Sequence, residues 1–176
     1  MKKIIIIGRT ASGKTTLANK LGKLLGIPVY HLDKIFWKDN GDHLHQAEFI
    51  EKVNEIMEKP SWIIDGDNPR SKTLDMRIMN ADTIILYDLP LLFILWRQTK
   101  RFFKYYNRVR PDMGGNNKQK YPFTWKEIKH ALEHPTKEIY AKILPHKNNK
   151  IVFIIKSSRD EISFFQKVNH LVDSRS

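Results

Sequence analysis

The stretch that decides the fold lies at residues 8–15 and spells Gly8-Arg9-Thr10-Ala11-Ser12-Gly13-Lys14-Thr15. It has the Gly-x₄-Gly-Lys-Thr spacing of a phosphate-binding loop (P-loop), between an apolar run at 3–7 and an amphipathic stretch from 14. In such a loop, backbone N–H groups surround phosphates, the lysine reaches the β- and γ-phosphates, and the threonine hydroxyl binds Mg²⁺. The start of the following helix adds a favourable dipole. The predicted ATP-binding residues are Gly8, Arg9, Thr10, Ala11, Ser12, Gly13, Lys14, Thr15 and Thr16.

Apolar runs alternate with helical stretches along the rest of the chain, a pattern typical of a parallel sheet covered by helices. Strands are predicted at 3–7, 29–32, 62–65, 83–87 and 150–155, and helices at 14–25, at 47–58, from 91, from 124 and from 158. The last two helices are marked by the capping-box spacings Thr124–Glu127 and Ser158–Glu161. The final helix is expected to bury Ile162, Phe165, Val168 and Leu171.

The expected fold class is therefore α/β: a three-layer α/β/α sandwich around a five-stranded parallel sheet. In such sheets, ligands bind beyond the carboxyl ends of the strands. The length of 176 residues suits a single domain, residues 1–176, and the 41% of hydrophobic residues suffices for a core.

Composition narrows the functional classes. The absence of cysteine excludes disulfides and thiolate metal sites and fits a cytoplasmic protein. The apolar run Leu91–Trp96 is far too short to cross a membrane. The net charge of +12 favours polyanions, namely nucleotides, phosphorylated substrates or nucleic acid, without choosing among them.

The P-loop class can be narrowed by elimination. Guanine-specific GTPases need an Asn-Lys-x-Asp motif, and the stretch Asn117-Lys118-Gln119-Lys120 lacks the aspartate. No predicted strand ends in the Asp-Glu pair that motor and transporter ATPases use to activate water. What remains is the plan of a small kinase with a basic insertion and a second substrate.

Several motifs carry a resemblance to a known family. They are Ile4–Gly8 with Ser12–Thr15, Val29–Lys34 with Phe36-Trp37, Trp62–Gly66, Arg77 with Ala81–Ile85, Leu95–Arg97, and Arg110–Met113. On these motifs the chain resembles the DNA topology modulation protein (FlaR-type) family, which is similar to adenylate, shikimate and gluconate kinases. The family usually has Asn-Tyr after the Asp-Gly pair, whereas this chain has Asp67-Asn68. The family name records a proposed effect on DNA supercoiling rather than a reaction.

The resemblance implies a metal site and an acceptor site. Asp65, at the end of a strand beside the P-loop strand, is expected to act with Thr15 in holding Mg²⁺ and its water. Asp33 follows the second strand, where kinases of this type hold the acceptor hydroxyl. Arg70 is expected to bind an acceptor phosphate or carboxylate with its planar fork, assisted by Arg77. The acceptor-binding region is placed at roughly 33–77.

A basic helical lid is predicted at roughly 97–126. Arg97 and Arg101 share a helix face at i, i+4 spacing, and Arg110 lies in the expected lid loop. Closing these arginines over the γ-phosphate would neutralise transition-state charge and exclude water. Arg159, after the last strand, is expected near the adenine ring, although a solvated loop fits it equally well.

Two histidine positions and one aromatic segment have competing interpretations. His31 is interpreted as a residue at the edge of the core rather than a catalyst. His130 and His134 have a spacing that can bind zinc, but no third ligand is evident. The segment 96–126 interleaves aromatic and basic residues, as single-stranded nucleic-acid binders do. Packing of a core or a lid is favoured for it over nucleic-acid binding.

The favoured function is transfer of the ATP γ-phosphate to a small-molecule acceptor, with ATP and Mg²⁺ as cofactors. Two alternatives stay open. One is an ATP-dependent regulator associated with nucleic acid, and the other is a slow ATPase. The acceptor and the oligomeric state are left open by the sequence.

Overall fold

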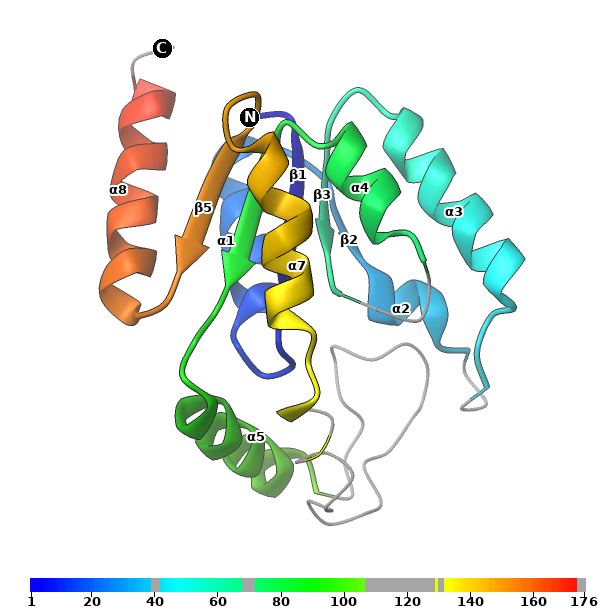
Figure 1. The fold of residues 1–176 in the computed structure, drawn as a ribbon, viewed down its shortest axis with the longest axis vertical. Coiled ribbons are helices and arrows are strands. Elements are labelled where there is room, and N and C mark those ends of the chain that lie inside the picture. Colours follow the sequence, from blue (N-terminus) through cyan, green and yellow to red (C-terminus); the bar gives the residue numbers. More distant parts are fainter. Residues whose placement is uncertain (39–41, 68–71, 107–128, 130–131, 174–176) are drawn as a thin grey trace.

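The computed structural model describes every residue except 39–41, 68–71, 107–128, 130–131 and 174–176 (Figure 1). Its centre is a five-stranded parallel sheet with the strand order β2-β3-β1-β4-β5. The strands are β1 (Lys3–Gly8), β2 (Val29–His31), β3 (Trp62–Asp65), β4 (Thr83–Tyr87) and β5 (Ile151–Ile155). All five predicted strands are confirmed, with ends that differ by at most one residue.

The central strand β1 is covered on both faces. Its four consecutive isoleucines, Ile4–Ile7, are fully buried, as expected of a strand between two layers. Successive side chains point to opposite faces, so Ile4 and Ile6 join one core cluster while Ile5 and Ile7 join the other. The three-layer sandwich predicted from the sequence is therefore confirmed.

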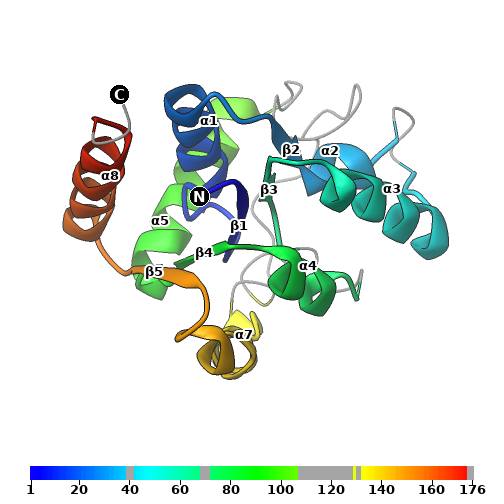
Figure 2. The same ribbon diagram turned by 90° about the horizontal axis from the view of Figure 1, so that it is seen from above.

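Helices cover both faces of the sheet and the carboxyl end of its strands (Figure 1 and Figure 2). They are α1 (Lys14–Leu25), α2 (Leu32–Phe36), α3 (Gln46–Glu58), α4 (Leu74–Asn80), α5 (Leu91–Tyr105), α7 (Thr136–Ile143) and α8 (Ser158–Asp173), with a short 3₁₀ turn at Leu144–His146. The helices α1 and α8 pack on one face of the sheet, and α3, α4 and α7 pack on the other. The helix α5 lies at the carboxyl end of the strands, on the side opposite to the N-terminus (Figure 1).

The last helix differs from its prediction in two ways. Its buried side chains are Phe164 and Val168, whereas Ile162 and Leu171 are exposed. Its N-terminus is capped one residue earlier than expected, because the N–H of Asp160 donates to Ser157 Oγ at 3.3 Å. The prediction is confirmed for Val168, and Phe165 packs partly buried against the same cluster, but Phe164 takes the buried place that was expected for Ile162 and Leu171. The other predicted cap, at Thr124–Glu127, lies outside the described residues.

Candidate active site

The P-loop joins β1 to α1 in a conformation that its glycines permit. Gly8 has φ of +139°, and a Cβ there would lie 2.3 Å from the carbonyl oxygen of Tyr87. Gly13 has φ of +108° and precedes α1 directly. Residues with a side chain rarely adopt such angles, so both positions require glycine. The loop therefore turns tightly against β4 before the helix begins.

Lys14 holds its ammonium group inside the loop. Its Nζ donates hydrogen bonds to the carbonyl oxygens of Gly8 and Arg9, at 2.6 and 2.7 Å. Desolvation by burial lowers the pKa of Lys14, and the carboxylates of Asp65, Asp67 and Asp33 act in the opposite direction. The nearby carboxylates thus favour the charged form of Lys14, and the loop carbonyls hold its ammonium group inside the loop.

Asp65 lies beside the P-loop because β3 pairs with β1. The register sets Asp65 next to Ile6, near the end of β1, as the sequence predicted. The Thr15 hydroxyl donates to Asp65 Oδ2 at 2.8 Å. The other oxygen, Oδ1, is buried and has no hydrogen-bond partner among the described residues. A hydroxyl and a carboxylate with one oxygen unused form a donor set that suits Mg²⁺.

Two arginines of α5 contact the P-loop from the other side. Arg97 Nη1 donates to the carbonyl oxygen of Ser12 at 2.6 Å, and Arg101 Nη2 donates to Thr10 Oγ1 at 3.1 Å. Arg97 also lies over the ring of Phe93, 4.5 Å from its centroid. The i, i+4 spacing predicted for these arginines therefore brings both to the phosphate-binding loop.

These groups surround one cavity of about 410 Å³ at the carboxyl end of the sheet. Asp33, in the first turn of α2, faces the same cavity. Sequence reasoning missed Tyr105 and Glu161, which also line it. Tyr105 could have been found, because it lies four residues after Arg101 on the same helix face. The described lining residues are Thr10, Ala11, Gly13, Lys14, Thr15, Thr16, Asp33, Asp65, Gly66, Arg97, Arg101, Tyr105 and Glu161.

Other predicted site residues lie elsewhere. Gly8 and Ser12 shape the loop without lining the cavity, and Arg9 points away to Asp88, with Nη1 3.6 Å from Oδ1. Arg159 is exposed on α8 and does not line the cavity. Since residues two apart on a helix point in nearly opposite directions, Glu161 takes the inward position instead. Arg70 and Arg110 lie outside the described residues.

Arg77 serves the structure rather than the cavity. It is fully buried in α4, and its guanidinium donates to the carbonyl oxygens of Gly66 at 2.8 Å and Asp67 at 3.3 Å. Burial lowers the pKa of Arg77 to about 10, against the raising effect of Asp67. The expectation that it contacts the acceptor is therefore corrected. Arg77 clamps the turn that follows β3.

Two histidines have acidic partners that the sequence did not reveal. His31 Nδ1 lies 2.9 Å from Asp65 Oδ2. His134, considered above for zinc, has Nε2 at 2.5 Å from Asp67 Oδ2 and Nδ1 at 2.9 Å from Thr136 Oγ1. Among the described residues, no three histidine or acidic side chains are grouped so that they could hold a metal ion by themselves. The contact of His31 with Asp65 follows from the register of β2 and β3, which pair His31 with Asp65.

The chain is similar to known proteins in its three-dimensional structure, but no sequence comparison finds a match. No family model matches the chain, and no curated protein sequence does. Shikimate kinase from Acinetobacter baumannii, solved in complex with shikimate, is 14% identical, with a TM-score of 0.59 over 100% of this chain and 95% of that one. The chain has the shikimate kinase fold.

Two further structures agree with this assignment. Shikimate kinase from Aquifex aeolicus vf5 is 20% identical, with a TM-score of 0.54 over 96% of this chain and 98% of that one. A gluconokinase from Sinorhizobium meliloti 1021 is 11% identical, with a TM-score of 0.53 over 99% and 97%. The structural likeness therefore extends over nearly the whole length of these three kinases.

Among the described helices, none is both long and apolar enough to cross a membrane.

Proposed function

We propose that this protein transfers the γ-phosphate of ATP to a hydroxyl group of a small molecule. The observation that carries the proposal is the convergence of three kinds of group on one cavity: the P-loop lysine Lys14, the pair Thr15 and Asp65, and the carboxylate of Asp33. A nucleotide-binding protein without an acceptor needs the first two but not the third. The fold shared with shikimate kinase and gluconokinase supports the same reaction class.

Mg²⁺ fits this cavity. Thr15 Oγ1 and the carboxylate of Asp65 would hold it, the latter through the buried Oδ1 that lacks a partner among the described residues. When bound with ATP, the ion neutralises charge on the β- and γ-phosphate oxygens. Asp65 also keeps the Thr15 side chain oriented, so the chain's own part is to present both oxygens in a fixed direction.

Lys14 and the arginines of α5 bind the triphosphate. Lys14 Nζ now donates to two loop carbonyls, and phosphate oxygens are stronger acceptors for the same ammonium. Arg97 and Arg101 lie against the loop and line the cavity, where charge develops as the phosphoryl group moves. Their position above the loop also limits the entry of water, which competes with the acceptor.

Asp33 orients the acceptor. Its carboxylate is solvent-exposed where it lines the cavity, so an incoming hydroxyl can donate to it. In the loose transition state of phosphoryl transfer the hydroxyl proton leaves late, and a carboxylate is a sufficient acceptor for it. Arg70 remains the predicted partner for an acidic group on the acceptor. Small hydroxylated acids are therefore the first acceptors to test, followed by nucleoside monophosphates.

The test is incubation with ATP and Mg²⁺ against panels of hydroxy acids, sugars and nucleoside monophosphates, with detection of phosphorylated product. Asp33→Asn separates this function from a slow ATPase, because it should lower transfer far more than nucleotide affinity. ATP consumption without any phosphorylated product, unaffected by Asp33→Asn, would favour the ATPase.

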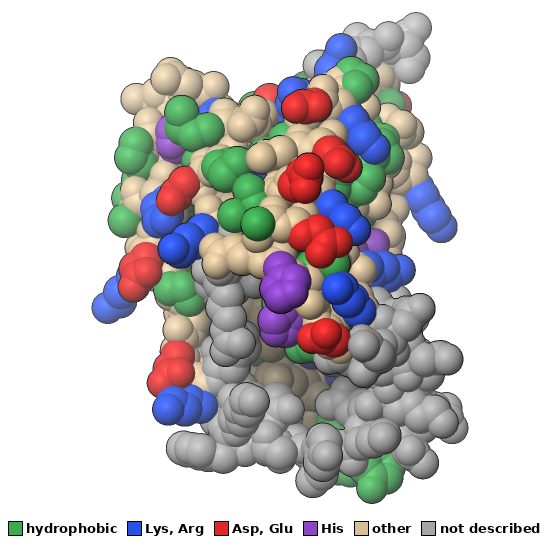
Figure 3. All heavy atoms as spheres, turned by 90° about the vertical axis from the view of Figure 1, so that its right-hand side faces the viewer, with side chains coloured by type: hydrophobic (Ala, Val, Ile, Leu, Met, Phe, Trp, Pro, Cys, Tyr) green, Lys and Arg blue, Asp and Glu red, His purple; other side chains and the backbone are tan. Residues whose placement is uncertain are grey.

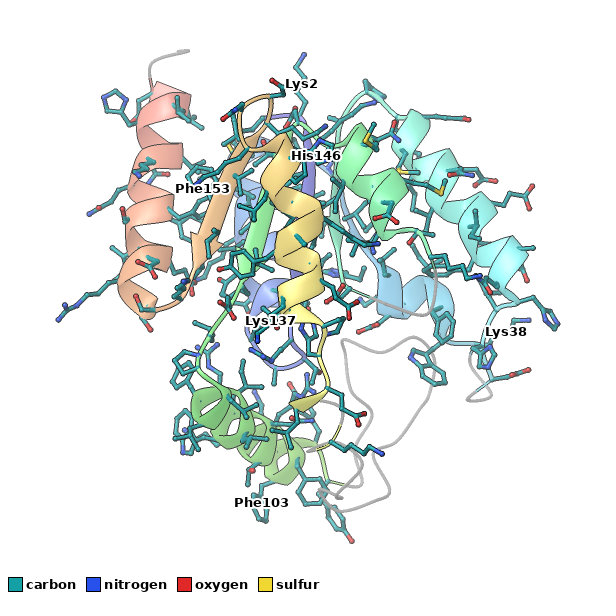
Figure 4. The ribbon with its side chains drawn as sticks, viewed as in Figure 1. Lys2, Lys38, Phe103, Lys137, His146 and Phe153 are labelled. Atoms are coloured by element: carbon teal, nitrogen blue, oxygen red, sulfur yellow. The ribbon has the colours of Figure 1, made fainter. Side chains whose placement is uncertain are left out.

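One observation favours a second candidate, binding of single-stranded nucleic acid. On α5 the rings of Trp96 and Phe103 are 55% and 74% exposed, and Lys100 Nζ lies 4.6 Å from the Trp96 centroid. Phe103 points away from the sheet (Figure 4). The side of the molecule that carries α3 is a weaker candidate for binding nucleic acid, because acidic side chains are mixed with basic ones there (Figure 3). Affinity for single strands that falls steeply with salt and is lost in Trp96→Ala would support this candidate.

A further inference from the structure

His31 and Asp65 are joined across the sheet. The strands β2 and β3 are parallel, and their register sets His31 directly beside Asp65, so both side chains leave the same face. His31 Nδ1 and Asp65 Oδ2 are 2.9 Å apart, and the two side chains are only 14% and 5% exposed. This contact is therefore largely shielded from water and links β2 to the P-loop edge of the sheet.

The two oxygens of Asp65 have different surroundings. Oδ2 accepts from the Thr15 hydroxyl and lies against His31 Nδ1, whereas Oδ1 is buried without a partner among the described residues. A carboxylate oxygen accepts hydrogen bonds, so in this contact the N–H of His31 Nδ1 donates to Asp65 Oδ2. Two donors at one oxygen prevent rotation of the carboxylate about its last bond. A buried acceptor without a hydrogen-bond partner is unfavourable, which indicates that Oδ1 gains a partner when the site is filled.

We infer that His31 is a positioning residue for the Mg²⁺ site. It holds Oδ2 of Asp65 so that Oδ1 stays available to the Mg²⁺ site, and it thereby sets the gain in nucleotide affinity that Mg²⁺ confers. The inference rests on the proposed function, because it supposes that the P-loop binds a magnesium nucleotide. A histidine that merely filled space at the edge of the core would affect stability without changing that gain.

Two variants of His31 separate these roles. His31→Asn keeps an N–H donor close to the place of Nδ1, whereas His31→Gln moves the donor toward the place of Nε2. Both are polar amides of neighbouring size, so a general packing effect should be shared by them. Binding of β,γ-imido-ATP is measured by calorimetry for the wild-type protein and each variant, with and without Mg²⁺, and thermal unfolding is measured alongside.

In His31→Gln the Mg²⁺-dependent gain in affinity should fall about tenfold, within the range typical of groups that orient metal ligands. Affinity without Mg²⁺ should be unchanged, and His31→Asn should restore most of the gain. An equal gain in all three proteins overturns the inference, as does an equal loss in both variants that follows their unfolding temperatures. Absence of β,γ-imido-ATP binding by the wild-type protein instead removes the proposed function itself, and this inference with it.

Discussion

Arg97 Nη1 donates a hydrogen bond to the carbonyl oxygen of Ser12, 85 residues earlier in the chain, at 2.6 Å. A Cβ on the next residue, Gly13, would lie 3.0 Å from the same guanidinium nitrogen. The first helical turns beyond β4 are therefore pressed against the phosphate-binding loop. Whatever binds in the loop is held between β1, α1 and α5.

Replacing Arg97 should damage transfer more than binding. Arg97→Ala is expected to lower kcat by about 10²–10³-fold, the usual loss when one donor to transition-state charge is removed. Steady-state kinetics with the acceptor found in the panel, together with calorimetry of nucleotide binding, measure both effects. Lys100→Ala is the matched control, because Lys100 lies on the same helix over Trp96 and does not line the cavity. Equal losses in the two variants would contradict the role given to Arg97.

Replacing Lys14 should weaken nucleotide binding without unfolding the protein. Lys14→Met keeps the length of the side chain but removes a cation whose pKa desolvation already lowers. We expect affinity for the magnesium nucleotide to fall about 100-fold, equivalent to about 2.7 kcal/mol, while the unfolding temperature stays equal or rises. Lys23→Met, on an exposed position of α1, should change neither. Unchanged affinity in Lys14→Met would refute the phosphate-binding role of the loop.

Gly8 and Gly26 form a matched pair for testing the loop. Both have positive φ, but a Cβ at Gly8 would meet Tyr87 O at 2.3 Å, whereas one at Gly26 has nothing within 4 Å. Gly26→Ala should cost about 1 kcal/mol, the penalty of the left-handed conformation alone. Gly8→Ala adds the clash with backbone and should cost about 3 kcal/mol or more. Denaturant unfolding midpoints give the comparison, and equal costs would show that β1 and β4 can separate at this point.

Arg77 should prove to be a stability residue. Arg77→Met removes the guanidinium from the carbonyl oxygens of Gly66 and Asp67 and leaves both buried groups short of a donor. The free energy of unfolding should fall by about 3 kcal/mol. In the fraction of Arg77→Met protein that stays folded, the KM for the acceptor should change little, because Arg77 does not contact the acceptor. A stable Arg77→Met protein with a much higher acceptor KM would instead restore the direct contact expected from the sequence.

Asp82 supplies a pH-dependent part of the stability. Burial alone would raise the pKa of Asp82, but the Thr83 hydroxyl, the N–H groups of Lys2 and Lys3, and the N-terminal ammonium together hold it below its usual value. A carboxyl with a lowered folded-state pKa stabilises above its unfolded pKa, and that contribution disappears as pH falls through the folded pKa. Asp82→Ala should therefore lose about 1 kcal/mol at pH 7, given partial solvent screening. In unfolding curves recorded from pH 7 downward, the difference should begin to shrink below about pH 4.

Much of the fold could be predicted because its signals are local. Each strand is a short apolar run between turn residues, and the helix ends at Lys14 and Gly26 follow from neighbouring residues. The P-loop is also local, since eight consecutive residues determine a turn, a helix start and an anion site. The parallel arrangement followed from the alternation of strands and helices, which placed Asp33 and Asp65 at one edge of the sheet.

By itself, then, the sequence determined the P-loop, the five strands and the edge at which ligands bind, because these depend on contiguous residues and on periodicity. Only the tertiary structure decided which acids and bases meet. His31 faces Asp65 through the register of two strands, and Arg77 is buried because α4 packs on the sheet. Glu161 rather than Arg159 faces the cavity because the rotation of α8 is set by Phe164 and Val168 in the core. Such choices depend on packing between segments far apart in the chain, and no local pattern encodes them.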